Sequence, residues 1–204
     1  EAVGLSSERL ARLTRAMQAA VDARQVAGTV TMVVRNGQVA YLEAAGARDV
    51  EQAAAMTPDT IFRIASMTKA VVSVAVMMLV EEGRLAITDP VSRYIPAFAT
   101  TTVLGTVNGR VAVVPANRAI TIRDLLTPTA GISYGGGPLE PWYSRAGFTQ
   151  WYFADRTEPM TAWIDKLATL PIDSQPGERW VYGYNTDVLG NVIERITGQT
   201  LATV

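Results

Sequence analysis

The stretch IFRIASMTK, residues 61–69, leads into an apolar segment, Met67–Glu82, that stops at Gly83. A length of about four turns and the glycine stop favour a helix over a strand. The side chains are apolar nearly all round, which predicts a buried central helix. Ser66 and Lys69 stand three residues apart at its start, a spacing that makes two helical side chains neighbours on one face.

The pair Ser66 and Lys69 suits nucleophilic catalysis. A serine hydroxyl is a weak nucleophile until a base takes its proton, and a lysine can do so when apolar surroundings lower its pKa. The N–H groups of the helix start would also stabilise an oxyanion on a substrate held by Ser66. The alternative is a serine cap with a surface lysine one turn on. Against it, Lys69 is one of only two lysines among 18 basic residues, and its neighbours are apolar.

The chain has 204 residues but no histidine and no cysteine. This excludes a Ser-His-Asp hydrolase, a thiol nucleophile and a His or Cys metal site within these residues, and no cofactor is expected. An apolar fraction of 49% predicts a real core, and a net charge of -1 gives no electrostatic reason to bind nucleic acid. No apolar run reaches the ~18–20 residues of a membrane helix. The compartment stays open between a bacterial cytoplasm, the periplasm and the exterior.

A second candidate group lies in the stretch WVYGYN, residues 180–185. The phenol of Tyr182 could relay a proton between a nucleophile and a leaving group, although an aromatic strand or turn packed on the core would look the same. Residues 131–135 match the G-x-S-x-G nucleophile elbow, but that motif needs a strand before it, a helix after it and a histidine partner. We therefore interpret 131–135 as a glycine-rich loop.

An aromatic cluster follows this loop. It could line a pocket for an apolar acyl or alcohol group, or form the small core of a helical cap, and both interpretations stay open. The candidate substrate-binding residues are Trp142, Tyr143, Phe148, Trp151, Tyr152 and Phe153, together with Tyr184.

The order of elements predicts an α+β fold. Ser6 or Ser7 can cap a first helix, and Asn36-Gly37 between two β-branched runs predicts an antiparallel hairpin. Mostly helices follow, among them a short one capped by Thr121 and a last one that stops at Gly198. We expect residues 1–60 to hold the first helix and the hairpin, and residues 61–204 to form a mostly helical subdomain.

Together these motifs resemble the serine β-lactamase-like family, in particular the family VIII carboxylesterases, which are relatives of class C β-lactamases and DD-peptidases. The resemblance runs over nearly the whole chain and its motifs stand in the family's order. They are residues 61–69, 82–85, 89–91, 120–127, 130–131, 175–177, 180–182 and 187–190.

The resemblance implies a β-lactamase/transpeptidase-like fold, an antiparallel sheet flanked by helices plus a mostly helical subdomain. It implies that Ser66 is the acylated nucleophile, Lys69 its activating partner and Tyr182 the tyrosine of the second motif. Pro128 stands where the family commonly has histidine. Tyr184 replaces the asparagine that lactamases carry two residues after the motif tyrosine, which suits an esterase.

The function implied is a serine hydrolase that cleaves small carboxylic esters through a Ser66 acyl-enzyme. A β-lactamase or D-amino-acid peptidase with the same residues is an alternative. A catalytically silent binding protein on this fold is an alternative from another class, and the complete set of Ser66, Lys69 and Tyr182 argues against it.

Length is the largest departure from the family, whose members continue well past the tyrosine motif with further strands, a third motif and a C-terminal helix. We therefore expect this chain to be the N-terminal part only. Its expected partners are a small ester and a C-terminal fragment of the same enzyme.

Overall fold

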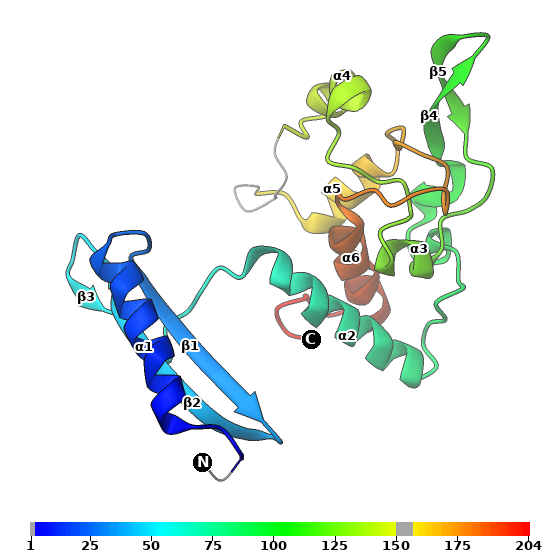
Figure 1. Cartoon of the computed structure of the whole chain (residues 1–204). Coiled ribbons are helices and arrows are strands. Elements are labelled where there is room, and N and C mark those ends of the chain that lie inside the picture. Colours follow the sequence, from blue (N-terminus) through cyan, green and yellow to red (C-terminus); the bar gives the residue numbers. More distant parts are fainter. Residues whose placement is uncertain (1–2, 150–156) are drawn as a thin grey trace. The chain divides into compact units, whose positions relative to one another are not determined.

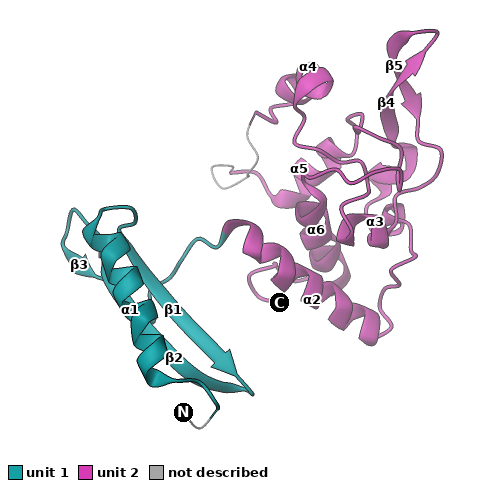
Figure 2. Ribbon diagram, viewed as in Figure 1, with its two compact units in different colours: residues 1–64 teal, residues 65–204 magenta. Residues whose placement is uncertain are grey.

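The Asn36-Gly37 turn forms the predicted hairpin in the computed structural model, which describes residues 3–149 and 157–204. Both turn residues adopt positive φ, 51° at Asn36 and 72° at Gly37, as a two-residue hairpin turn requires. The chain divides into unit 1, Glu1–Ile64, and unit 2, Ala65–Val204 (Figure 2).

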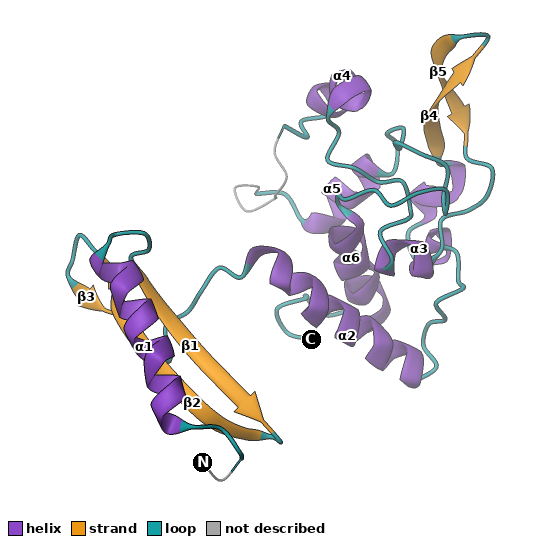
Figure 3. Ribbon diagram, viewed as in Figure 1, coloured by secondary structure: helices purple, strands orange, loops and turns teal. Residues whose placement is uncertain are grey.

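Unit 1 consists of one helix on an antiparallel sheet of order β1-β2-β3 (Figures 1 and 3). Its elements are α1 (Ser7–Asp22), β1 (Gly28–Arg35), β2 (Gln38–Asp49) and β3 (Ala54–Ala55). The predicted N-cap is confirmed at Ser6, whose side chain accepts a hydrogen bond from the backbone N–H of Arg9 at 3.3 Å.

Unit 2 is mostly helical, with α6 packed against α2, α3 and α5. Its elements are α2 (Thr68–Glu81), β4 (Thr102–Val107), β5 (Arg110–Pro115), α3 (Ile122–Leu126), α4 (Glu140–Arg145), α5 (Met160–Leu167) and α6 (Asn185–Thr197). Its core contains fully buried side chains from several of these helices, such as Val76, Ile164 and Val192. Burial of each such side chain contributes roughly 1.5–3 kcal/mol. Helix α6 ends at Gly198, whose φ of 72° is the left-handed conformation that glycine favours.

Helix α2 differs from the prediction in two respects. It begins at Thr68, after a 3-10 turn over Ala65–Met67. Among the described residues of unit 2, it is also buried on one side only: Val72 and Val76 are buried there, whereas Val71 and Val74 are more than 60% exposed. The prediction of burial all round is therefore wrong for this unit.

A second hairpin, β4–β5, was not anticipated from the sequence. Its turn is again Asn-Gly, with φ of 51° at Asn108 and 74° at Gly109. The backbone of Ile172 extends the pairing, because its N–H donates to Thr102 and its C=O accepts from Leu104. The hairpin is thereby joined to the segment that follows α5.

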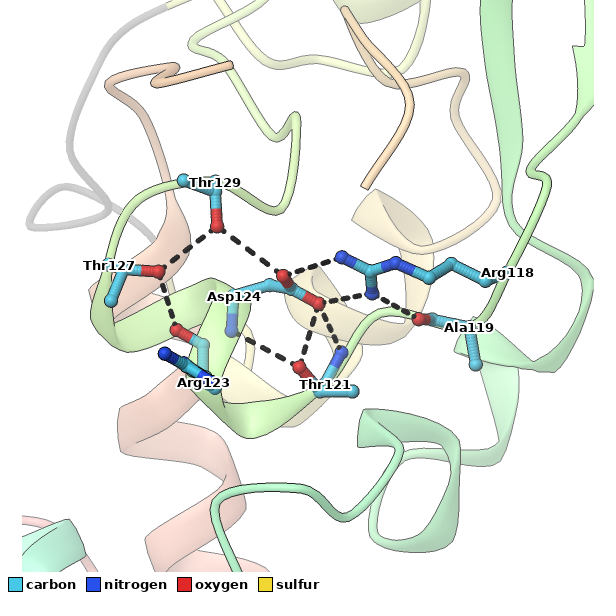
Figure 4. Close-up of polar contacts among 7 residues, drawn as sticks. All are labelled: Arg118, Ala119, Thr121, Arg123, Asp124, Thr127 and Thr129. Carbon is cyan, nitrogen blue, oxygen red and sulfur yellow. Dashed lines mark hydrogen bonds and ion pairs between the residues drawn. The ribbon is translucent and has the colours of Figure 1, made fainter. Parts of the chain in front are cut away.

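The start of α3 carries the predicted capping box, in which Thr121 and Asp124 bond each other's backbone N–H. Figure 4 shows that Asp124 is also the centre of a larger set, the Arg118–Asp124 cluster, made by Arg118, Thr121, Asp124 and Thr129. Its carboxylate accepts from both guanidinium Nη atoms of Arg118, at 2.6 and 2.8 Å, and from the Thr129 hydroxyl at 3.3 Å. The cluster fixes the loop that leaves α3.

No helix in the described ranges, 3–149 and 157–204, is long and apolar enough to cross a membrane.

Candidate active site

Ser66 lies in the 3-10 turn directly before α2, and Lys69 in the first turn of that helix. The preceding residue, Ala65, has a φ of 45°, a left-handed conformation that strains a non-glycine residue. Such strained residues gather at functional sites, where surrounding structure enforces them. Ser66 does not cap α2: the N-cap is Met67, and no side chain caps this helix.

The side chain of Ser66 instead contacts the two other residues that the sequence singled out. Its Oγ lies 2.6 Å from the phenol Oη of Tyr182, and the Nζ of Lys69 donates to the same Oγ at 3.3 Å. The Lys69 Nζ also lies 4.6 Å from the centroid of the Tyr182 ring. The structure thus brings Ser66, Lys69 and Tyr182 together, and we call these three residues the Ser66 cluster.

Hydrogen-bond directions follow from this geometry. A hydroxyl has one hydrogen to donate and can accept as well. Because Lys69 donates to the Oγ of Ser66, the serine hydrogen is free to point at the Oη of Tyr182. Either hydroxyl of this contact can therefore be the donor.

The segment around Tyr182 is held by the loop of residues 128–133. The N–H of Val181 donates to the carbonyl of Pro128 at 2.8 Å, and the Asn185 amide donates to the carbonyl of Ile132 at 3.3 Å. Gly183 permits this close approach, since a Cβ there would lie 2.3 Å from the Ile132 oxygen. Hydrogen bonds to backbone carbonyls of this loop thus hold the chain on both sides of Tyr182.

The pKa values of two neighbouring tyrosines move in opposite directions. Hydrogen bonding to Lys69 and Ser66 lowers the pKa of Tyr182, since both stabilise the phenolate. Burial raises the pKa of Tyr134 to about 12. The two rings make an edge contact with centroids 5.8 Å apart. Of the two tyrosines, Tyr182 is therefore the one that ionises more readily.

A carboxyl group lies near this site as well. Asp187 is in the first turn of α6, and burial raises its pKa to about 6, an effect that the positive charge of Lys69 partly offsets. The negative charge of Asp187 in turn acts on Tyr182 and opposes the lowering of its pKa.

The aromatic candidates are divided between core and surface. Tyr143, Phe148 and Tyr184 are buried in the core of unit 2, whereas Trp142 on α4 is 36% exposed. The edge contacts of Tyr184 with Phe148 and Tyr134 connect this aromatic core to the ring of Tyr182. The remaining three candidates lie outside the described residues: Trp151, Tyr152 and Phe153.

The G-x-S-x-G stretch has no nucleophile elbow. Ser133 accepts a hydrogen bond from the N–H of Gly135 at 3.1 Å, and residues 131–135 belong to no helix or strand. The loop nevertheless contributes Tyr134 to the site, a residue that the sequence reasoning missed because the motif around it was set aside.

Asp187 was missed for another reason. It stands in the quoted motif of residues 187–190, but an acidic residue in a first helical turn is ordinary. What distinguishes Asp187 from other acidic residues at helix starts is its burial near Lys69, which only the folded structure shows. Within the part of the chain that the structure describes, no three acidic side chains gather in a way that could hold a metal ion.

Known proteins resemble this chain in sequence and in fold. Residues 13–204 match the Beta-lactamase family. Esterase EstB of Burkholderia gladioli is 36% identical over 196 residues, which cover 94% of this chain and 46% of EstB. Among solved structures, EstCE1, described as a hydrolase with promiscuous acyltransferase activity, superposes with a TM-score of 0.81 at 30% identity and covers 95% of this chain and 48% of EstCE1.

Unliganded simvastatin synthase LovD from Aspergillus terreus superposes with a TM-score of 0.76 at 29% identity, over 97% of this chain and 51% of LovD. The chain thus spans about half the length of these relatives. The expected β-lactamase-like fold and the resemblance to esterases of this superfamily are confirmed. The chain belongs to the Beta-lactamase family.

Proposed function

We propose that the protein is a serine hydrolase that cleaves small carboxylic esters through an acyl-enzyme on Ser66, with Lys69 and Tyr182 as the proton-transfer groups. The observation that carries this proposal is the contact of the Ser66 Oγ with the Tyr182 Oη at 2.6 Å and with the Lys69 Nζ at 3.3 Å. The esterases among its relatives support the substrate class.

The reaction has two steps. In the first, the Oγ of Ser66 bonds to the ester carbonyl carbon while its proton passes to the Lys69–Tyr182 pair, and the carbon–alkoxy bond breaks as Tyr182 protonates the departing alcohol. In the second, water attacks the acyl carbon and gives a proton to the same pair. The bond from the acyl carbon to the Ser66 Oγ then breaks, the pair returns the proton to Oγ, and the acid leaves. Because Lys69 and Tyr182 both contact the Oγ of Ser66, we assign the base to the pair rather than to either residue.

The fate of the acyl group separates two candidate activities. An alcohol that replaces water in the second step turns hydrolysis into acyl transfer without any change in the residues used. Relatives named as methylbutanoyltransferases, 31% identical to this chain, favour this as the second candidate. Adding an alcohol acceptor and quantifying ester against acid distinguishes the two.

The decisive experiment measures hydrolysis of short-chain p-nitrophenyl esters by the full-length protein. Ser66→Ala should abolish turnover, and a fluorophosphonate probe should label the wild type at Ser66. Ser133→Ala is the matched control, because it removes the serine of the G-x-S-x-G loop and should leave turnover intact. Activity that survives Ser66→Ala would refute the proposal.

The alternatives have their own readouts. A β-lactamase would turn over a chromogenic cephalosporin with a larger kcat/KM than the p-nitrophenyl ester. A silent binding protein would give neither turnover nor a probe adduct on Ser66.

A further inference from the structure

The pocket between α2 and α6 contains a charged group for which the two-step reaction gives no role. This half-open pocket of about 150 Å³ is lined by Thr68 and Val72 of α2 and by Asp187, Asn191 and Glu194 of α6, among others. Lys69 lies between Thr68 and Val72 in the chain, one residue from the former. The carboxyl of Asp187 and the ammonium of Lys69 therefore come from the two helices that face each other here.

Charged and titratable groups of the described residues face Asp187 from α2, from α6 and from two loops. Lys69 of α2 acts on its carboxyl, and Asp187 acts on Tyr182 and Tyr134 from the two adjoining loops. Glu194 lines the same pocket from α6 itself, but its carboxylate is already engaged by the Asn191 amide and the N–H of Leu201. Among these neighbours, Lys69 is the cation.

We propose that Asp187 is the counter-charge of Lys69, a positioning residue whose negative charge sets how strongly the ammonium acts on Tyr182 and so the pH at which Ser66 becomes reactive. This inference rests on the proposed function. With Asp187 ionised, the field of Lys69 at the phenol is partly cancelled. With Asp187 neutral, the full charge of Lys69 acts on Tyr182 and on the bound substrate.

The direction of the effect follows from charge alone. A nearby negative charge raises the pKa of every group around it, whether lysine or phenol. Asp187→Asn removes that charge while keeping size and hydrogen-bonding capacity. The phenol of Tyr182 then loses its proton more readily, and the acidic limb of the kcat/KM profile should move to lower pH by about one unit.

The test uses the full-length protein and two readouts. The first is the pH profile of kcat/KM for a p-nitrophenyl ester. The second is the phenolate absorbance of Tyr182, obtained as the difference between each protein and its Tyr182→Phe counterpart, which needs no turnover. Asp187→Asn should lower both midpoints, and Asp187→Glu, which retains the charge, should restore them toward wild type.

Glu194→Gln is the matched control, since it removes a carboxylate from the same pocket two helical turns away and should leave both midpoints in place. Two results for Asp187→Asn would overturn the inference. One is a midpoint of the phenolate absorbance titration that equals the wild-type midpoint. The other is a shifted absorbance midpoint together with an unchanged pH profile of kcat/KM. Failure of the proposed function looks different: the wild type would show no turnover that depends on Ser66, while the absorbance titration would still report on Asp187.

Discussion

Two of the polar clusters in unit 2, the Arg118–Asp124 cluster and the Ser66 cluster, differ in how fully their side chains are hydrogen-bonded. In the Arg118–Asp124 cluster, the Asp124 carboxylate is only 8% exposed and accepts hydrogen bonds from a guanidinium, a backbone N–H and two hydroxyls. In the Ser66 cluster, Tyr182 is 37% exposed, Ser66 is exposed and Lys69 is half-buried, with two hydrogen bonds joining the three side chains. In the first cluster, which we call saturated, hydrogen bonds from groups of the fold itself engage both oxygens of the carboxylate and stabilise that fold. The sparse one keeps a hydroxyl and a phenol accessible to a substrate.

The largest expected effect tests the sparse cluster. Tyr182→Phe removes the oxygen that lies 2.6 Å from the Ser66 Oγ and should lower kcat by about 10²–10⁴-fold, as loss of a general acid–base does. The unfolding temperature should stay close to wild type, because this phenol is exposed. Tyr134→Phe is the control: it removes a hydroxyl from the neighbouring ring and should retain most activity. Equal losses in both variants would mean that the aromatic contact, not the proton, matters.

The next effect tests the saturated cluster. Asp124→Ala deletes the acceptor on which Arg118, Thr121 and Thr129 converge and should cost about 2–3 kcal/mol of unfolding free energy. Chemical denaturation of the full-length protein measures this. Glu82→Ala breaks a pair with Arg84 in which both side chains are well exposed, and it should cost less than about 0.5 kcal/mol. Similar costs would show that the saturated cluster is no more structural than a surface ion pair.

A third prediction concerns the backbone contact that joins the tyrosine segment to the loop of residues 128–133. In Gly183→Ala the new Cβ would lie 2.3 Å from the carbonyl oxygen of Ile132, so one segment must move, at a cost of roughly 2 kcal/mol. Activity should fall too, because Tyr182 precedes the substitution. Gly136→Ala is the control, since a Cβ there meets nothing within 4 Å and its φ of -78° suits alanine. A Gly183→Ala variant as stable as this control would contradict the close packing.

The sequence was most informative where signals are local. The turn at Asn36-Gly37, the cap at Thr121 and the neighbouring pair Ser66 and Lys69 depend on residues a few positions apart. The same Asn-Gly signal stands at 108–109, between Val107 and Arg110, and should have predicted the second hairpin. A hairpin at this position is therefore predictable from local sequence alone.

Contacts between residues far apart in the sequence could not be predicted from local patterns. Tyr182 is 116 residues from Ser66, so residue spacing could not join them and only the resemblance to a family suggested it. The apolar character of α2 predicted burial but not on which side, since that depends on which elements pack against it. Asp187 looked like an ordinary helix-start carboxylate, because burial beside Lys69 is a property of the packed helices.

The smallest predicted effect is on the pH dependence of stability, to which the carboxyls of Asp124 and Asp187 should contribute in opposite directions. Although burial opposes it, hydrogen bonding to Arg118 and Thr121 lowers the pKa of Asp124, whereas burial raises the pKa of Asp187 to about 6. The unfolded value for both is about 3.9. Asp124 therefore adds stability above about pH 4 that is lost as pH falls through its folded pKa, and Asp187 subtracts stability as pH rises from about 4 to 6. Chemical denaturation at several pH values measures the free energy of unfolding. Asp124→Asn should lower it less at pH 3 than at pH 7. The unfolding free energy of Asp187→Asn should rise relative to that of the wild type as the pH increases from 4 to 7. Parallel pH dependences in the two variants would contradict the opposite roles of the two carboxyls.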